Sequence, residues 1–121
     1  MARARLMKPG FFKNEDLGKL SPLARLCFTG LWTLADREGR LEERPERIKA
    51  ELFPYEKRLT VPAVSRMLRT LADSGFVVRY GNNGHRYLAI PKFLEHQHPH
   101  HREPASKLPA PPTRRVDVKK R

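Results

Sequence analysis

The stretch TVPAVSRMLRTLADSGFVVRYGNNGHRYLAI, residues 60–90, decides the fold, and its first half predicts a helix. Thr60 suits the N-cap position, Pro62 suits the first turn, and Gly75 suits the position after the last turn. Between these ends, apolar side chains recur at the spacing of one helical face, at Val64, Met67, Leu68 and Leu71. We therefore expect this helix to bury one face and expose the other.

The second half of the stretch predicts a β-hairpin. Residues 76–80 and 86–90 are rich in β-branched and aromatic side chains, and GNNG at 81–84 separates them. Asn-Gly between two such runs is the strongest short hairpin signal in a sequence. Tyr80 and Tyr87 lie on the two runs, and we expect both rings to pack in the core.

A central buried helix is expected further towards the N-terminus. Ser21 and Pro22 form a helix start, and the run after them is apolar nearly all round. Gly39 is placed to cap the C-terminal end of this helix. Before it, Asn14 suits the cap of a short helical turn. The pair at 11–12, both phenylalanines, should pack on the core and hold the N-terminal segment in place.

Between these regions the sequence predicts a short strand at 40–42 and a helix that starts at Pro45 and stops at Pro54. The order of elements is then helix, short strand, helix, helix and two-stranded hairpin, which is the order of a winged helix-turn-helix. We therefore expect an α+β fold, mainly α, with a three-helix core, a C-terminal β-hairpin wing and a basic disordered tail.

The expected organisation is a basic N-terminal arm at 1–13, a winged-helix domain at 14–98 and a Pro-rich basic tail at 99–121. Five of the eleven prolines lie in 99–112, and large apolar residues are nearly absent there. Such a composition is typical of a disordered or extended segment.

The net charge of +12 on 121 residues indicates a polyanionic partner, most simply nucleic acid. Residues 1–13 carry four basic residues and no acid, and residues 102–121 carry seven basic residues and two acids. The body between them is nearly balanced, so the two ends are interpreted as flexible arms that grip phosphate. An anionic membrane surface and simple solubility are the competing interpretations. No apolar run approaches the roughly 20 residues of a membrane span.

The outer face of the helix after Thr60 is the expected DNA-reading surface, because the second helix of a helix-turn-helix enters the major groove. Arg66 and Arg69 stand one turn apart on this face, and arginine can bind guanine or phosphate with two hydrogen bonds. The hairpin would contact the DNA backbone, and the C-terminal tail would add non-specific affinity. The expected DNA-binding residues are Lys57, Arg58, Ser65, Arg66, Arg69, Thr70, Arg79, Asn82, Asn83, Arg86, Arg114 and Arg115. For any single arginine a solvated surface charge is an equally good interpretation, whereas the set favours binding.

Four of the five histidines lie within HQHPHH, residues 96–101. Neutral imidazoles bind zinc, nickel or copper, but Pro99 interrupts the run and no apolar shell is visible around it. The sequence has no Gly-rich phosphate loop, no Ser/His/Asp spacing and no cysteine pair for zinc. We therefore expect no catalytic residues, no metal site, no cofactor and no enzymatic activity. The lone Cys27 is expected to be a core thiol, and its inability to form an internal disulfide fits a reducing cytoplasm.

Four motifs occur in a specific order: KPGFFKNEDLGKLSPLARLCFTGLWTLADREGRL at 8–41, ERIKAELFP at 46–54, LADSGFVVRY at 71–80 and RYLAIPKFLEHQHPH at 86–100. In these motifs the chain resembles the N-terminal winged-helix domain of phage replication proteins, of the replisome-organiser or replication-initiator type, over about residues 6–103. The resemblance implies binding to origin or regulatory DNA, with self-association or recruitment of a helicase or its loader. Larger family members carry a further C-terminal domain, whereas this chain ends after a short basic tail and is either a stand-alone protein or a fragment.

Within the resemblance, His96, Gln97, Pro99 and His100 match the family's motif, whereas His98 and His101 look incidental. A segment of this kind could cap the wing, contact a partner subunit or contact phosphate. Clustered histidines are mostly uncharged near neutral pH and would become charged as DNA approaches.

Two functions of different classes follow from these patterns. The first is a phage or prophage protein that binds double-stranded DNA in the cytoplasm of the bacterial host, in replication initiation or transcriptional regulation. A homodimer would suit a symmetric operator. The alternative is a protein-interaction module that binds and inhibits, or recruits, a host replication, transcription or defence protein. RNA binding is disfavoured, because Tyr80 and Tyr87 are the only candidates for an aromatic stacking platform.

Overall fold

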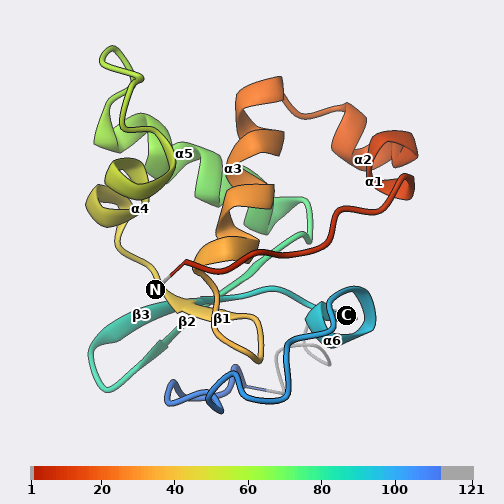
Figure 1. Ribbon diagram of the computed structural model, residues 1–121. Coiled ribbons are helices and arrows are strands. Elements are labelled where there is room, and N and C mark those ends of the chain that lie inside the picture. Colours follow the sequence, from red (N-terminus) through yellow and green to blue (C-terminus); the bar gives the residue numbers. More distant parts are fainter. Residues whose placement is uncertain (1, 113–121) are drawn as a thin grey trace, which may run out of the picture.

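The computed structural model describes residues 2–112 of the chain, which form a small α+β domain that is mainly helical. The elements, in chain order, are α1 (Gly10–Lys13), α2 (Glu15–Gly18), α3 (Pro22–Leu34), β1 (Arg40–Glu42), α4 (Pro45–Leu52), α5 (Val61–Asp73), β2 (Val78–Asn82), β3 (His85–Ala89) and α6 (Phe93–His96). Figure 1 shows α3, α4 and α5 on one side of the small sheet, with α1 and α2 beside α3.

The core lies where α3, α5 and the central strand meet. Its innermost side chains are fully buried, as for Leu31 of α3, Leu68 of α5 and Leu88 of β3, each 0% exposed. The predicted inward face of α5 is confirmed at Val64, Leu68 and Leu71, which are all 0% exposed. Cys27 of α3 is also fully buried, as expected for a core thiol.

The sheet is antiparallel with strand order β1-β3-β2, so the third strand is central. Arg40 of β1 and Val78 of β2 both pair with Ala89 of β3. The short strand predicted at 40–42 and the hairpin are therefore confirmed, and the strand pairs with β3 to make the sheet three-stranded.

The connection of the hairpin is shorter than predicted. Gly81 pairs with Arg86 and Asn82 pairs with His85, so a turn of two residues replaces the four-residue GNNG loop. Its residues, 83 and 84, have φ values of 50° and 81°. A two-residue hairpin turn with positive φ at both positions matches the right-handed twist of its strands, and Asn-Gly is its favoured sequence.

Three predicted helix caps are confirmed. The side chains of Asn14, Ser21 and Thr60 accept hydrogen bonds from the backbone N–H three residues later, at the starts of α2, α3 and α5. The C-terminal cap predicted at Gly39 is wrong, because α3 ends at Leu34. Gly39 instead sits at φ 82° in the turn from α3 into β1, and its N–H donates to the carbonyl of Asp36.

Both ends of the described chain lie against the body. Near the N-terminus, Phe11 packs on Trp32 with ring centroids 5.8 Å apart, whereas Phe12 is 73% exposed, so the prediction for this pair holds only for the first ring. At the other end, Tyr80 Oη donates to the carbonyl of Pro109 over 2.7 Å, and Arg40 donates to the carbonyl of Leu108 over 3.1 Å. Of the two predicted alternatives for 99–112, disordered or extended, the structure has the extended one, and the segment is docked on the body.

None of the helices in residues 2–112 has both the length and the apolar character that a membrane crossing requires.

Candidate nucleic-acid interface

The outer face of α5 carries four of the predicted site residues. Arg66, Arg69 and Thr70 are exposed, whereas Ser65 is half-buried. Neither arginine side chain makes a hydrogen bond or ion pair with any residue in 2–112. Because α5 buries its opposite face in the core, both guanidinium groups are held towards solvent, one helical turn apart.

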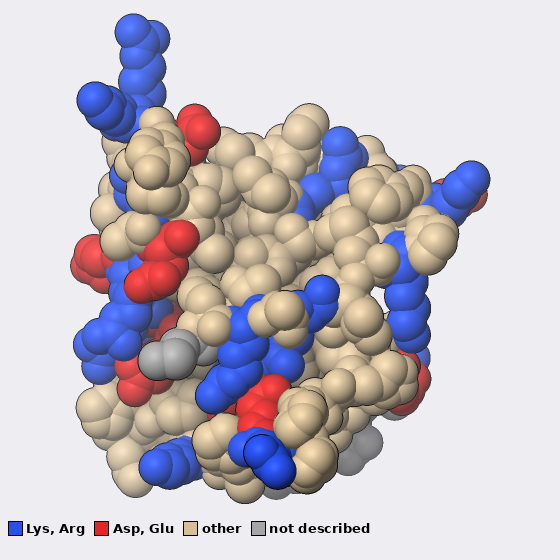
Figure 2. All heavy atoms as spheres, in the orientation of Figure 1, with Lys and Arg blue, Asp and Glu red and all other residues tan. Residues whose placement is uncertain are grey.

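The loop between α4 and α5 carries two further predicted residues, Lys57 and Arg58. Both are exposed, and neither is paired with a residue in the described part of the chain. In Figure 2, basic side chains project from the surface at the position that this loop occupies in Figure 1.

On the hairpin, Arg79 and Arg86 converge on one carboxylate, that of Glu43. Arg79 Nη2 lies 2.8 Å from Glu43 Oε2, and Arg86 Nε lies 3.6 Å from Glu43 Oε1. The Glu43 side chain is 3% exposed and the Arg86 side chain is 65% exposed. The predicted hairpin cations are therefore partly neutralised, and Arg86 is the more accessible of the two.

The remaining predicted residues are distributed unevenly. Asn82 and Asn83 are exposed at the tip of the hairpin. Arg114 and Arg115 lie outside the described residues. No hydrogen bond or ion pair within 2–112 joins Arg66 or Arg69 to the hairpin.

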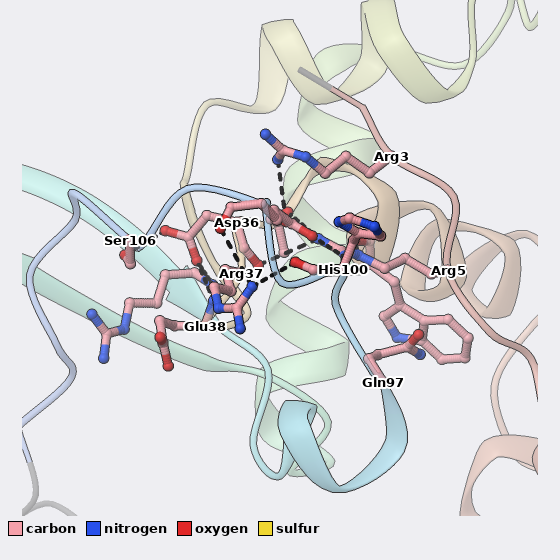
Figure 3. A network of polar contacts seen from close by, with 12 residues as sticks. Arg3, Arg5, Asp36, Arg37, Glu38, Gln97, His100 and Ser106 are labelled. Carbon is pink, nitrogen blue, oxygen red and sulfur yellow. Dashed lines mark hydrogen bonds and ion pairs between the residues drawn. The ribbon is translucent and has the colours of Figure 1, made fainter.

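The N-terminal basic segment is not the flexible phosphate-gripping arm that its charge predicted. The Arg5 side chain is 4% exposed and forms hydrogen bonds of 3.1 and 2.9 Å with the two carboxylate oxygens of Glu103. Arg5 also donates to the carbonyls of Trp32 and Ala35, each over 3.0 Å. Arg3 lies 3.3 Å from the same carboxylate, so both arginines link the N-terminal segment to the segment around Glu103 (Figure 3).

Glu103 thus joins the C-terminal segment to the N-terminal segment. The hydrogen bonds from Arg5 hold the pKa of the Glu103 carboxyl below its usual value, and the charges of Arg5, Arg3 and Arg37 act in the same direction against the opposing effect of burial. Arg37 also donates to the carbonyl of His100 over 2.7 Å, which fixes the segment just before Glu103 (Figure 3).

The histidine-rich segment is organised around Gln97. This side chain is buried, and its amide accepts from the Leu6 N–H over 2.7 Å and donates to the Leu6 carbonyl over 2.9 Å. His96 and His98 are exposed, and the rings of His100 and His101 stack with centroids 4.3 Å apart. Within residues 2–112 no group of three or more His, Cys, Asp or Glu side chains could hold a metal ion.

Sequence reasoning missed two features of this surface. Glu43 was not singled out, because nothing local marks an acid that will be buried between two cations from another part of the chain. Tyr55, in the loop with Lys57 and Arg58, is 90% exposed and is the aromatic contact that the sequence pattern does not reveal. The sequence signal for its exposure is its position directly after Pro54, which ends the preceding helix and starts a loop.

Comparisons of the chain with protein-family models, with curated proteins and with solved structures found no match.

Proposed function

We propose that the chain is a winged-helix DNA-binding protein of the type found in phage replication proteins, acting in replication initiation or transcriptional regulation in a bacterial host. The observation that carries the proposal is the outer face of α5, where Arg66 and Arg69 are exposed and unpaired within the described residues. A pair of free guanidinium groups one turn apart on a rigid helix suits recognition of guanine edges and phosphates.

The arrangement of elements supports this proposal. Under this proposal, α4 and α5 form the helix-turn-helix, and α5 is the helix that enters the major groove. The β2–β3 hairpin is the wing, and Asn82, Asn83 and Arg86 at its exposed end contact the backbone. Arg79 is bound to Glu43 and its main role is to hold the wing in place.

The charge of the molecule supports the same partner. Since Arg3 and Arg5 are used within the fold, the N-terminal segment contributes less to DNA affinity than its composition suggests. Lys57 and Arg58 are unpaired within 2–112 and would add phosphate contacts at the start of α5. A homodimer placing two α5 helices on a symmetric site would be consistent with this mode of binding.

The experiment is selection from a random duplex pool by gel shift at two salt concentrations, with sequencing of the bound fraction. We expect an enriched sequence, and we expect Arg66→Ala and Arg69→Ala to weaken binding to that sequence more than to random DNA. Arg102→Ala is the matched control, because it removes one exposed charge outside α5. Equal losses on both DNAs for all three variants would contradict base reading, and no duplex binding at low salt would contradict the proposal itself.

A second candidate function is a protein-interaction module that binds a host protein, and one groove favours it. The groove beside α3 has a volume of about 320 Å³, and three exposed apolar side chains line it: Leu6, Met7 and Leu26. Over α3 the surface is largely uncharged (Figure 2). Exposed apolar patches of this kind often mark protein contacts. Absence of duplex affinity, together with a host protein captured by the wild type and lost with Leu26→Glu, would favour this function over the first.

A further inference from the structure

The loop between α4 and α5 consists of two consecutive turns, and the residue at each end of the loop packs into the core. The Glu56 N–H donates to the Phe53 carbonyl over 3.2 Å, and the Leu59 N–H donates to the Glu56 carbonyl over 3.1 Å. Phe53 is 2% exposed, and Leu59 packs against the core cluster. Pro54 takes the second position of the first turn, which its fixed φ favours. The loop is therefore a defined structure held at both ends.

This construction places one aromatic ring at a corner. Tyr55 occupies the third position of the first turn and is 90% exposed, more than any other large hydrophobic residue in 2–112. The other two tyrosines are unavailable: Tyr80 and Tyr87 are 7% and 8% exposed, and their rings stack on each other 5.5 Å apart. Their predicted core packing is confirmed, but they are not the only candidates for an aromatic platform.

The corner of the second turn adds two cations beside the ring. Lys57 and Arg58 take its central positions, and both are exposed and unpaired within 2–112. Glu56 is the one acid of 53–59, and it forms no ion pair with either cation. An exposed aromatic ring next to unpaired cations is the combination that binds single-stranded nucleic acid, since the cations follow the phosphates and the ring stacks on a base.

We propose that Tyr55 stacks on an unpaired base, and that this contact gives the protein a preference for DNA with locally open base pairs. The inference rests on the proposed DNA-binding function and adds to it the state of the DNA that is bound. In a closed duplex each base face is covered by its neighbours, so the ring finds a partner only where pairing is lost or easily lost. The loop leads directly into α5, so the ring belongs to the segment at the N-terminal end of the helix that is proposed to enter the major groove.

The test compares two DNAs of the same length and the same flanking sequence, one fully paired and one with a short central mismatched bubble. Affinity is measured by fluorescence anisotropy at one salt concentration for the wild type, Tyr55→Phe and Tyr55→Ala. We expect the wild type to bind the bubble more tightly. We expect Tyr55→Ala to lose about 5- to 100-fold on the bubble and little on the duplex, and Tyr55→Phe to keep the preference, because stacking needs the ring and not the hydroxyl.

Phe12→Ala is the matched control, because Phe12 is the other highly exposed aromatic residue, at 73%, and lies in α1 rather than in the loop. It should leave both affinities unchanged. Urea unfolding should give the wild-type midpoint for both Tyr55 variants, and a midpoint close to it for Phe12→Ala, whose ring packs edge-on against Phe11 with centroids 5.2 Å apart.

The outcomes separate this inference from the proposed function. If the wild type binds duplex and Tyr55→Ala matches it on both DNAs, or loses affinity equally on both, the stacking inference is overturned while DNA binding stands. If the wild type binds neither DNA at low salt, both fail.

Discussion

The side chain of Gln97 bridges two segments that are far apart in the sequence. Its amide makes both hydrogen bonds that the Leu6 backbone offers, as a neighbouring strand would, and it is 4% exposed. The histidines around it are mostly turned to solvent. The order of this segment therefore comes from the Gln97 amide and from the Arg37 hydrogen bond to the His100 carbonyl, rather than from the imidazoles.

Replacing Gln97 by alanine should destabilise the fold by about 1–3 kcal/mol, because it removes two hydrogen bonds and leaves the Leu6 backbone groups without their partners. His98→Ala, one position along and exposed, should stay within about 0.5 kcal/mol of the wild type. Urea unfolding followed by circular dichroism measures both. Equal stabilities for the two variants would show that the bridge contributes nothing.

Glu103→Gln should destabilise the protein by about 2 kcal/mol at neutral pH, because it removes the negative charge that pairs with Arg5 and leaves one acceptor oxygen where the carboxylate has two. The folded-state pKa of Glu103 lies below its unfolded value. The ion pair therefore contributes fully at pH values above the unfolded pKa, about 4.3, and this contribution is lost as the pH falls through the folded pKa.

Melting temperatures of the wild type and Glu103→Gln, measured from pH 7 down to pH 3, test this dependence. The gap between them should be largest at neutral pH and should shrink in acid. A gap that stays constant with pH would mean that the carboxylate charge is not what links the two ends of the chain.

At the scale of elements, the turn from α3 into β1 depends on a glycine for two reasons. Gly39 has a φ of 82°, and a Cβ added to it would lie 2.6 Å from the Phe93 side chain. Gly39→Ala should therefore cost more than about 2 kcal/mol, from backbone strain together with displacement of Phe93.

Gly10→Ala is its control, because a Cβ at Gly10 meets nothing within 4 Å and Gly10 lies in a helix. This change should be neutral or slightly stabilising, since alanine favours helix more than glycine does. Thermal melts compare the two variants, and a loss at Gly10 equal to that at Gly39 would contradict the steric argument.

The elements that the sequence predicted well are those with local causes. Thr60 caps α5 with a hydrogen bond to a residue three positions away, so the same short window holds both the cause and the consequence. Gly39 was misassigned because a helix end and a tight turn both require positive φ, and the window does not tell which is present. The docked C-terminal segment could not be predicted, because Leu108 and Pro109 are held by Arg40 and Tyr80 from distant elements.

The candidate site also has one part that local sequence predicts and one part that depends on distant residues. Exposure of Arg66 and Arg69 followed from the period of α5 alone, and both are exposed. The hairpin arginines were expected to be free, but their partner Glu43 is 36 residues before Arg79 in the sequence. Such a pairing depends on how β1 docks against β3, and no pattern within the hairpin reports it.

At the scale of the whole molecule, the +12 charge predicts a DNA affinity that falls linearly with salt on a double-logarithmic plot. Arg114→Ala combined with Arg115→Ala should weaken binding to all sequences alike and lower the salt slope by about 2. Anisotropy titrations at several salt concentrations, on selected and random duplexes, give both numbers. A loss confined to the selected sequence would instead place these residues at base edges.

The reactivity of Cys27 can report how often the folded core opens. It is the one cysteine in the sequence, it is fully buried, and burial raises its pKa to about 12. Alkylation requires thiolate, so the native protein should resist a thiol reagent at neutral pH, whereas the unfolded chain should react readily. The labelling rate, followed by mass spectrometry, should then measure how often the core opens. It should slow when a ligand is added that binds only the folded state, and this offers a search for the partner that needs no prior modification of the native protein.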